Sequence, residues 1–454
     1  MDLSMIGKKM GTACNRILRF LVVLFCIGTG VVNAEPDPQM SLELCVETAL
    51  LNNPSLLALK AQVKGAEYDV KMAEGRRWPS LHFNAAESLY SDDTRLFPAS
   101  YNGEQGVFGK DMTDLGLILQ LPLYTGGQLS GATAAARHNR EAFEYTLLRA
   151  SQILEFDVAQ TAYKILGQVK QLESIIFSQQ VLNRDKERIT AMVDARKAAR
   201  VDLLRMDVRL AKIDQARVSA ENNLYGAWQE LFRLMGKNGP LPDSLPGIDG
   251  SLLPVPPLPD TGDALEKALE NRPDIKALDS RVAVQKQKAA SARGKALPQI
   301  YLKGSYGYRF MTDSNDYPQG TDDSDVRGSI GVNLDLPLFE GGHIRAEINR
   351  EQALLASIEN QRHSLGLLVQ KEIRTAVLDM TSAIQRIKTQ KTAVAQARDA
   401  LAIEQEKYLL GKGTILDVLD AQNAMLEIET EYYRAAADYH TAVARFALTR
   451  GDTK

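Results

Sequence analysis

The sequence of 454 residues predicts an α+β membrane protein built by an internal tandem duplication. A seven-residue motif, LPLYTGG at 121–127, returns as LPLFEGG at 336–342. Two stretches before each motif alternate between apolar and polar residues, and a long segment almost free of proline and glycine follows it. Each half is therefore expected to be a pair of membrane-spanning β-strands joined to a layer of long helices.

The duplication extends along most of the chain. ALLNNPSLLAL at 49–59 matches ALENRPDIKAL at 268–278 with an offset of 219, and the offset is 215 from the LPL motifs onward. The predicted repeats span 35–236 and 264–454, and each contains a helix, two strands, a long helix and a return helix. Between them, 237–263 is rich in proline, which interrupts helices and central strands and so predicts a semi-rigid extended connector.

Residues 1–34 have the features of a secretory signal peptide, although an uncleaved anchor is the alternative. The features are the basic residues Lys8, Lys9, Arg16 and Arg19, the mostly apolar stretch 17–32, and the small-residue cleavage site at 32–34. Without 1–34, which holds four of the 54 basic and one of the 57 acidic residues, the net charge is −6. This balance gives no support for nucleic-acid binding, and Cys45 is left without a disulfide partner.

Period-two alternation predicts four strands, at about 80–90, 113–123, 299–310 and 326–338. Their lengths suit tilted membrane-spanning strands, whereas a soluble hairpin with one half-buried face is the alternative. Because no other segment has the ~18 apolar residues of a transmembrane helix, any insertion must be by strands. Four strands cannot close a barrel, since the smallest bacterial barrels have ~8, and open edges are not tolerated in lipid. At least two copies must therefore combine.

The helical segments are expected to form coiled coils. In 342–409, apolar residues recur at a spacing of seven or three, as in a coiled-coil stripe. The stripe consists of Val377, Ile384, Ile387, Val394 and Leu401. In the first half, the shorter helices at 46–77 and 201–236 together match the length of the long helix at 127–193, so they are expected to lie end to end along it.

Several motifs together resemble the TolC-type outer-membrane efflux protein family over 35–454. They are the duplicated plan, the LPL[FY]-x-GG motif, Tyr408-x-x-Gly411, and GTILDVLDAQN at 413–423. The resemblance implies a homotrimer whose four strands per chain form a twelve-stranded barrel in the lipid of a Gram-negative outer membrane. A long periplasmic α-helical coiled-coil barrel would continue it. Such proteins are passive exit ducts of tripartite efflux or type I secretion systems. They dock to a periplasmic adaptor protein and an inner-membrane RND pump or ABC exporter.

The resemblance also implies a pore constriction at Asp417 and Asp420. Three copies would place six carboxylates in a ring that selects cations. For Asp417 a second interpretation is equally open, because Thr414-x-x-Asp417 is also a capping box at the start of a helix. Asp420 lies one turn deeper and is less explained by capping.

The resemblance also implies that residues of the turns beside these aspartates form polar links that close the mouth or dock an adaptor. Asp202 and Tyr408 match positions that family members use for polar links between neighbouring coiled coils. The basic residue usual in the turn is replaced here by Gly413, two residues after Gly411. Substitute cations could come from the opposite turn, where the alternative is a solvated tip; they are Arg196, Lys197 and Arg200.

The repeated LPL motif is interpreted as the joint between barrel and helices. Proline is expected to end the strand ladder, and the paired glycines to permit the change of direction into the helix. The residues of the joint are Pro122, Gly126, Gly127, Pro337, Gly341 and Gly342.

Two other classes of protein were considered. The sequence contains no phosphate loop, metal-ligand cluster or nucleophile elbow, so it predicts no enzyme, metal site or cofactor. An exported coiled-coil scaffold without channel activity is the alternative to a channel. The cargo is not encoded in any motif.

Overall fold

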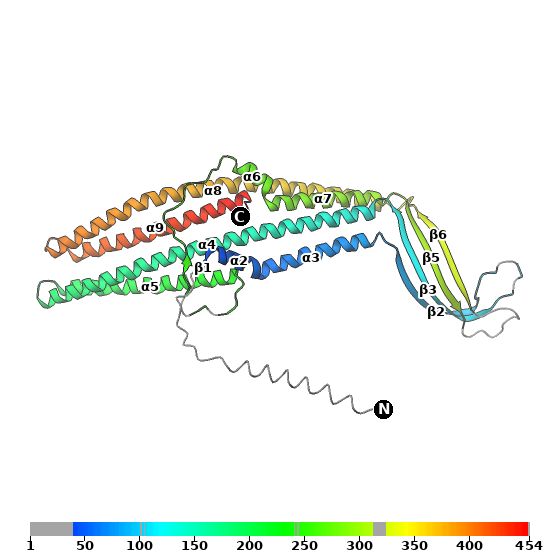
Figure 1. Ribbon diagram of the computed structural model, residues 1–454, viewed down its shortest axis with the longest axis horizontal. Helices are drawn as coiled ribbons and strands as arrows, with labels where there is room; N and C mark the ends of the chain where they lie inside the picture. The colour runs from blue at the N-terminus through cyan, green and yellow to red at the C-terminus, as the bar shows by residue number, and fades with distance from the viewer. Residues whose placement is uncertain are drawn as a thin grey trace, which may run out of the picture.

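The computed structural model describes residues 40–99, 102–103, 105–239, 241–242, 245–311 and 324–452. The molecule is elongated: a sheet lies at one end, and helices run from it toward two turns at the far end (Figure 1). The predicted signal peptide, 1–34, lies outside the described residues.

The two halves have the same order of elements. The first contains α2 (Leu42–Asn52), α3 (Pro54–Gly75), β2 (Ser80–Arg95), β3 (Phe108–Thr125), α4 (Gln128–Asp194) and α5 (Arg200–Leu234). The second contains α6 (Ala264–Asn271), α7 (Pro273–Gly294), β5 (Gln299–Phe310), β6 (Ser324–Asp335), α8 (His343–Leu409) and α9 (Ile415–Arg450). A short parallel pair, β1 (Met40–Ser41) and β4 (Ile248–Asp249), lies beside them.

The two sequence offsets also relate corresponding helices and strands of the structure. Helices α3 and α7 both have 22 residues and begin 219 residues apart, whereas α4 and α8 both have 67 and begin 215 apart. Strand register follows the same rule, because Ser80 opposes Gln120 and Gln299 opposes Asp335. A residue of one half can therefore be assigned its counterpart in the other.

The strands form one antiparallel sheet in the order β2-β3-β5-β6. The β3–β5 pair joins the two halves. One face carries exposed apolar side chains, among them Leu81, Phe83, Leu117, Tyr306, Val332 and Leu334. The other face is polar, and on it Arg309 Nε lies 2.6 Å from Asp114 Oδ1. Within the described residues, β2 and β6 each pair on one side only.

Some predicted strand ends were wrong. In the first half, β2 continues past residue 90 to Arg95, and β3 runs from Phe108 to Thr125 rather than over 113–123. In the second half, β6 ends at Asp335 rather than at 338.

The expectation that proline ends the ladder holds at one joint and fails at the other. Pro337 follows the end of β6, but Pro122 lies inside β3 opposite Tyr301. The β3–β5 register shifts between Pro122 and Tyr124. A proline, which has no N–H to donate, is tolerated at such an irregularity.

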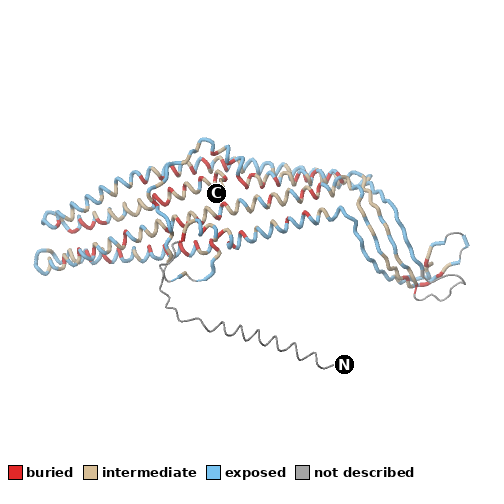
Figure 2. Tube along the Cα trace, in the orientation of Figure 1, coloured by how far each residue is buried: buried red, intermediate tan, exposed pale blue. Residues whose placement is uncertain are grey.

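The long helices organise the rest of the molecule. Helices α3 and α5 lie along the two ends of α4, and α7 and α9 lie along α8 in the same way (Figure 1). Helix α4 also packs against α7 and α9, so it holds the two halves together. Buried residues form rows along the helices, whereas the sheet is largely exposed (Figure 2).

The predicted stripe on α8 was only partly right. Of its members Ile387 is buried, whereas the other four are half-buried beside the true core row. That row recurs every three or four residues and consists of Val369, Ile373, Ala376, Met380, Ala383 and Ile387. Two of the six are alanines, which let helices approach closely but which a search for large apolar residues passes over.

The predicted first helix of each half is broken once, before a proline that begins the next helix. At the first break, Asn53 caps α3 and its Nδ2 donates to the carbonyl of Leu234 at 2.9 Å. At the second break the counterpart is Arg272, which is 2% exposed. Its guanidinium donates to Asp274, Glu372 and the carbonyl of Thr449. Both breaks thus tie the short helices to the end of the return helix.

The proline-rich connector is packed rather than free-standing. Leu252 is buried among residues of α8 and α9. Tyr439 donates its hydroxyl to the carbonyl of Pro256 at 2.8 Å, and His440 Nε2 lies 3.0 Å from the carbonyl oxygen of Leu252. These contacts fix the connector against α9.

Each joint between a strand and a long helix uses two glycines with positive φ. The values are 60° and 81° at Gly126 and Gly127, and 56° and 83° at Gly341 and Gly342. At Gly126 an added Cβ would also lie 2.2 Å from the carbonyl oxygen of Gly294. At Gly341 and Gly342, no described atom lies within 4 Å of an added Cβ.

Replacing Arg272 with alanine should lower the free energy of unfolding by about 3–5 kcal/mol, because it leaves two carboxylates without their buried cation. Urea unfolding in detergent measures the change. The matched control is Arg362→Ala, which removes an exposed ion pair with Asp279 and should cost less than about 1 kcal/mol. Equal effects of the two substitutions would contradict the structural role given to Arg272.

Replacing Gly342 with alanine should cost about 1–2 kcal/mol, since an L-residue is strained at its positive φ. The control is Gly65→Ala inside α3, where there is open space and ordinary helical φ. That control should be neutral or stabilise the protein by up to about 1 kcal/mol. Thermal unfolding of the two variants tests the joint, and a Gly342→Ala variant as stable as the control would argue against it.

Candidate functional site

The two helical turns at the end opposite the sheet carry most of the predicted site residues (Figure 1). Arg196 in the α4–α5 turn and Gly411 in the α8–α9 turn are counterparts, and both have positive φ, 55° and 71°. Glycine adopts this conformation without strain, whereas arginine does not. The first turn therefore holds Arg196 in a strained backbone conformation.

Asp417 closes a capping box at the start of α9. Its Oδ2 accepts from the Thr414 backbone N at 2.9 Å and from the Thr414 hydroxyl at 2.7 Å, and its own N donates to Thr414 Oγ1. The hydrogen bond from the Thr414 side chain, followed by that from its backbone, lowers the pKa of Asp417. Asp417 is also exposed. Capping and contact with solvent at the tip are therefore compatible.

Asp420 lies one turn further along α9, is exposed, and has a cation nearby in its own chain. Burial lowers the pKa of Arg209 on α5, and the charge of Asp420 opposes that shift. Arg209 Nη2 also donates to Asn423 Oδ1 at 2.7 Å. No sequence motif points to Arg209, because only the packing of α5 beside α9 brings it near the aspartate.

Tyr408 lies within reach of the charge of Asp202. Tyr408 is 8% exposed and packs among apolar residues of α4, α5 and α9. Burial raises its pKa, and the nearby charge of Asp202 raises it further. Its hydroxyl has no hydrogen-bond partner among the described residues. Tyr408 therefore presents an unpaired polar group inside the tip.

A buried polar cluster beside Tyr408 links the two coiled coils of the chain. Gln422 Nε2 on α9 donates to Asp185 Oδ2 on α4 at 2.9 Å, and Arg188 Nη2 donates to Asp185 Oδ1 at 2.6 Å. Asp185 and Gln422 are 7% and 5% exposed. The cluster has no local sequence motif, because Asp185 and Gln422 lie 237 residues apart.

The basic residues of the first turn do not reach Tyr408. Arg196, Lys197 and Arg200 are exposed and form no ion pair within the described part of the chain. Arg188 is the cation whose charge acts on Tyr408. At Gly413 an added Cβ would lie 3.2 Å from the Cβ of Lys407, so a larger residue there would be crowded.

No group of His, Cys, Asp or Glu side chains in the described ranges could hold a metal ion. Of the helices that the structure describes, none combines the length and apolarity needed to cross a membrane.

Comparison with known proteins agrees with this architecture. Residues 45–237 and 264–451 match the family described as outer membrane efflux protein. The outer membrane protein TolC of Vibrio cholerae is 22% identical over 403 residues, which are 88% of each chain. The outer membrane efflux protein BepC of Brucella suis is 25% identical over 96% of this chain and 90% of its own.

A solved structure shares the fold. The outer membrane protein VceC of Vibrio cholerae superposes with a TM-score of 0.75 at 21% identity, and the match covers 90% of this chain and 96% of that one. The family consists of channel proteins rather than enzymes, and its members lie in the outer membrane of Gram-negative bacteria. Because the family match covers both halves, this chain belongs to the outer membrane efflux protein family.

Proposed function

We propose that the chain forms, as a homotrimer, the passive exit duct of a tripartite efflux or type I secretion system. The observation that carries the proposal is the four-stranded sheet, which has an apolar face and continues directly into long helices, and whose two edges have no partner strand among the described residues. Three copies would complete a twelve-stranded barrel, and a closed barrel leaves no unpaired strand edge in lipid.

The opposite end of the duct is proposed as its narrow mouth. Asp417 and Asp420 are exposed near the tip of α9, so copies arranged around an axis would bring their carboxylates together. A ring of carboxylates favours cations. Because Arg209 lies near Asp420, it would weaken the field of the ring.

The gate is proposed to include Tyr408, Asp202 and the Asp185–Arg188–Gln422 cluster. Opening the mouth requires α8 and α9 to move relative to α4 and α5. Such movement would break the link between Gln422 and Asp185, which costs free energy because both groups are buried.

The partners proposed are a periplasmic adaptor protein and an inner-membrane RND pump or ABC exporter. The adaptor would dock at the two turns. In the α4–α5 turn, Arg196, Lys197 and Arg200 lie exposed without ion-pair partners among the described residues. In such a system the pump and adaptor select the cargo, which consists of small molecules, metals or proteins.

A coiled-coil scaffold without a channel is the competing hypothesis, and it predicts different behaviour. The duct should require detergent for extraction, have the mass of three chains in detergent, and conduct ions across planar bilayers. A scaffold should extract without detergent and conduct nothing. Multi-angle light scattering and single-channel recording, applied to the same preparation, decide between them.

Neutralising the mouth should reduce its cation selectivity. Asp417→Asn with Asp420→Asn should lower the cation-to-anion permeability ratio and weaken block by multivalent cations, whereas Arg209→Ala should raise both. Reversal potentials in a salt gradient measure the ratio. Asp399→Asn, an exposed site on α8 outside the tip, is the control. If all variants conduct like the parent protein, these residues do not line the constriction.

A further inference from the structure

A pocket of about 290 Å³ lies at the joint where β3 passes into α4, beside the turn that joins α3 to β2. In Figure 1 this is the border between the sheet and the helices. The lining of the pocket combines one cation, small hydroxyl side chains and an apolar wall. The residues that define this chemistry are Arg77, Leu123, Tyr124, Thr125, Leu129 and Ser130.

The cation of this joint pocket has no counter-ion among the residues that the structure describes. Arg77 is exposed and forms no ion pair there. The acidic residue that precedes it, Glu74, is paired instead with Arg137, and Glu74 Oε1 lies 2.7 Å from Arg137 Nη2. Segments 75–86 and 115–136, which meet at the joint, contain no Asp or Glu. Arg77 is therefore free to bind an anion.

A hydroxyl group of the joint pocket supplies a second donor. Thr125 Oγ1 accepts a hydrogen bond from the backbone N of Leu129 at 3.4 Å, which leaves the hydrogen of the hydroxyl for another acceptor. The hydroxyl of Ser130 already donates to the carbonyl of Gly127 at 3.0 Å. Phosphate oxygens accept several hydrogen bonds at once, and an arginine can bind them with two parallel N–H groups. Arg77 and Thr125 together therefore suit a phosphate.

The rest of the pocket wall continues the apolar face of the sheet. Tyr124 opposes Ile300, and Ile300 opposes Leu334, so these side chains form one row on that face. Leu123 and Tyr124 are 53% and 45% exposed, and Trp78, next to Arg77 in the chain, is 73% exposed. Exposed aromatic side chains are typical of the border between lipid hydrocarbon and headgroups. In the proposed duct, the pocket therefore opens at the level of the headgroups.

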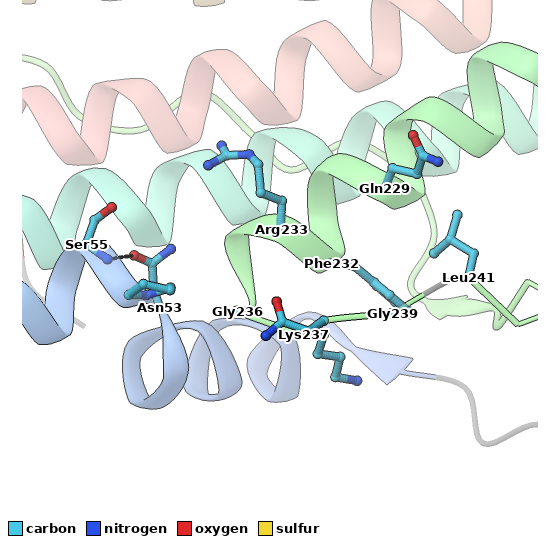
Figure 3. Close-up of a pocket in the computed structure, with 11 residues that line it drawn as sticks. Asn53, Ser55, Gln229, Phe232, Arg233, Gly236, Lys237, Gly239 and Leu241 are labelled. Atoms are coloured by element: carbon cyan, nitrogen blue, oxygen red, sulfur yellow. Dashed lines mark hydrogen bonds between the residues drawn. The ribbon is translucent and has the colours of Figure 1, made fainter.

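A larger pocket, of about 450 Å³, differs because its cations are already engaged. It lies at the C-terminal end of α5, the counterpart of α9, and away from the sheet (Figures 1 and 3). Arg233 Nη2 donates to Glu230 Oε1 at 2.6 Å. Lys237 Nζ lies 5.1 Å from the centre of the Phe232 ring. Of these two pockets, the one at the joint therefore has the unpaired cation.

We propose that the joint pocket binds the phosphate headgroup of an anionic phospholipid from the periplasmic leaflet of the outer membrane. The proposal rests on the proposed placement of the sheet in that membrane. Arg77 and Thr125 would donate to the phosphate, while Leu123 and Tyr124 would contact the glycerol and the first carbons of the acyl chains. Arg76 is exposed beside the site and adds attraction to an anionic lipid surface. A bound headgroup would hold the joint at the membrane surface.

The second half of the chain provides a comparison, because it keeps the apolar wall and changes the charges. LPLYTGG and LPLFEGG give both joints the same apolar residues or close substitutes. By the offsets of 219 and 215, the equivalents of Arg77, Thr125 and Ser130 are Ala296, Glu340 and Arg345. The guanidinium is thus lost from the turn before the strand, and the charge of Glu340 offsets that of Arg345. A carboxylate at this place would also repel a phosphate.

Native mass spectrometry of the purified full-length protein in a non-ionic detergent tests the site, with phosphatidylglycerol as the probe. Arg77→Gln should lower the affinity for this lipid about tenfold, because it removes a hydrogen bond between charged groups. The matched control is Arg293→Gln, which removes an exposed arginine at the end of α7, beside the joint but outside the pocket. It should leave the affinity unchanged. Ala296→Arg with Glu340→Thr should add a second retained lipid per chain.

Lipid retention in detergent does not depend on conduction, so the site and the duct can fail separately. If Arg77→Gln retains the lipid like the parent protein, the site is wrong, even where the protein forms a conducting trimer. If Arg293→Gln lowers the affinity equally, the attraction is general and the pocket is not the site. If inorganic phosphate displaces the lipid completely, the pocket binds free phosphate and the lipid assignment is wrong. Retention that depends on Arg77 in a protein that conducts nothing would support the site and contradict the duct.

Discussion

The outer sides of β2 and β6 carry main-chain N–H and C=O groups that have no partner strand within the described part of a single chain. In hydrocarbon each unsatisfied group costs several kcal/mol, so a sheet with an outward apolar face must be completed before it is stable there. The pairing that joins β3 to β5 inside the chain shows how completion is possible. The second strand of one half can pair with the first strand of another half in the register that β3 and β5 show.

The duplicated helices extend this constraint along the whole molecule. Inside the chain, α4 packs against the second half through polar contacts. The side chains of Arg149 and Gln152 donate hydrogen bonds to backbone carbonyls at the C-terminal end of α9. The open counterpart on the first half presents Phe232 and Leu241 instead. The two surfaces occupy equivalent positions in the duplicated plan, but they differ in chemistry. In the proposed homotrimer this difference would give each half its own partner, which would favour ordered assembly over mixed pairings.

The tips contain two kinds of hydrogen bond: those that cap one helix and those that join two helices. Asp417 is held by Thr414 within α9, so the start of this helix keeps its cap regardless of its neighbours. The link between the coiled coils depends instead on the hydrogen bond from Gln422 of α9 to Asp185 of α4, whose other carboxylate oxygen accepts from Arg188 within α4. Tyr408 lies buried beside them with an unpaired hydroxyl. A movement of α8 and α9 would therefore break few bonds and would give Tyr408 access to a new partner.

Local patterns were good guides to the elements and poor guides to their contacts. Alternation located all four strands within a few residues, although it ended β6 too late, because Leu336 and Leu338 continue the pattern beyond the last backbone pair at Asp335. The heptad spacing indicates helix α8, but it points to Val377 and Ile384 rather than to Ala376 and Ala383, because hydropathy does not report how closely two helices pack. No local motif points to Arg209 or Arg272, because Asn423 and Glu372, with which they form hydrogen bonds, are distant in sequence.

The sequence by itself determined the duplicated plan, the family resemblance and the position of each joint, because periodicity and paired glycines are local properties of the chain. Only the tertiary structure decided which charges are paired, which apolar rows are covered and which are left open. Those properties depend on side chains brought together across 100 or more residues, as at Arg272 and Glu372. They also depend on the different surroundings of the two halves, and a motif that is present in both halves carries no information about that difference.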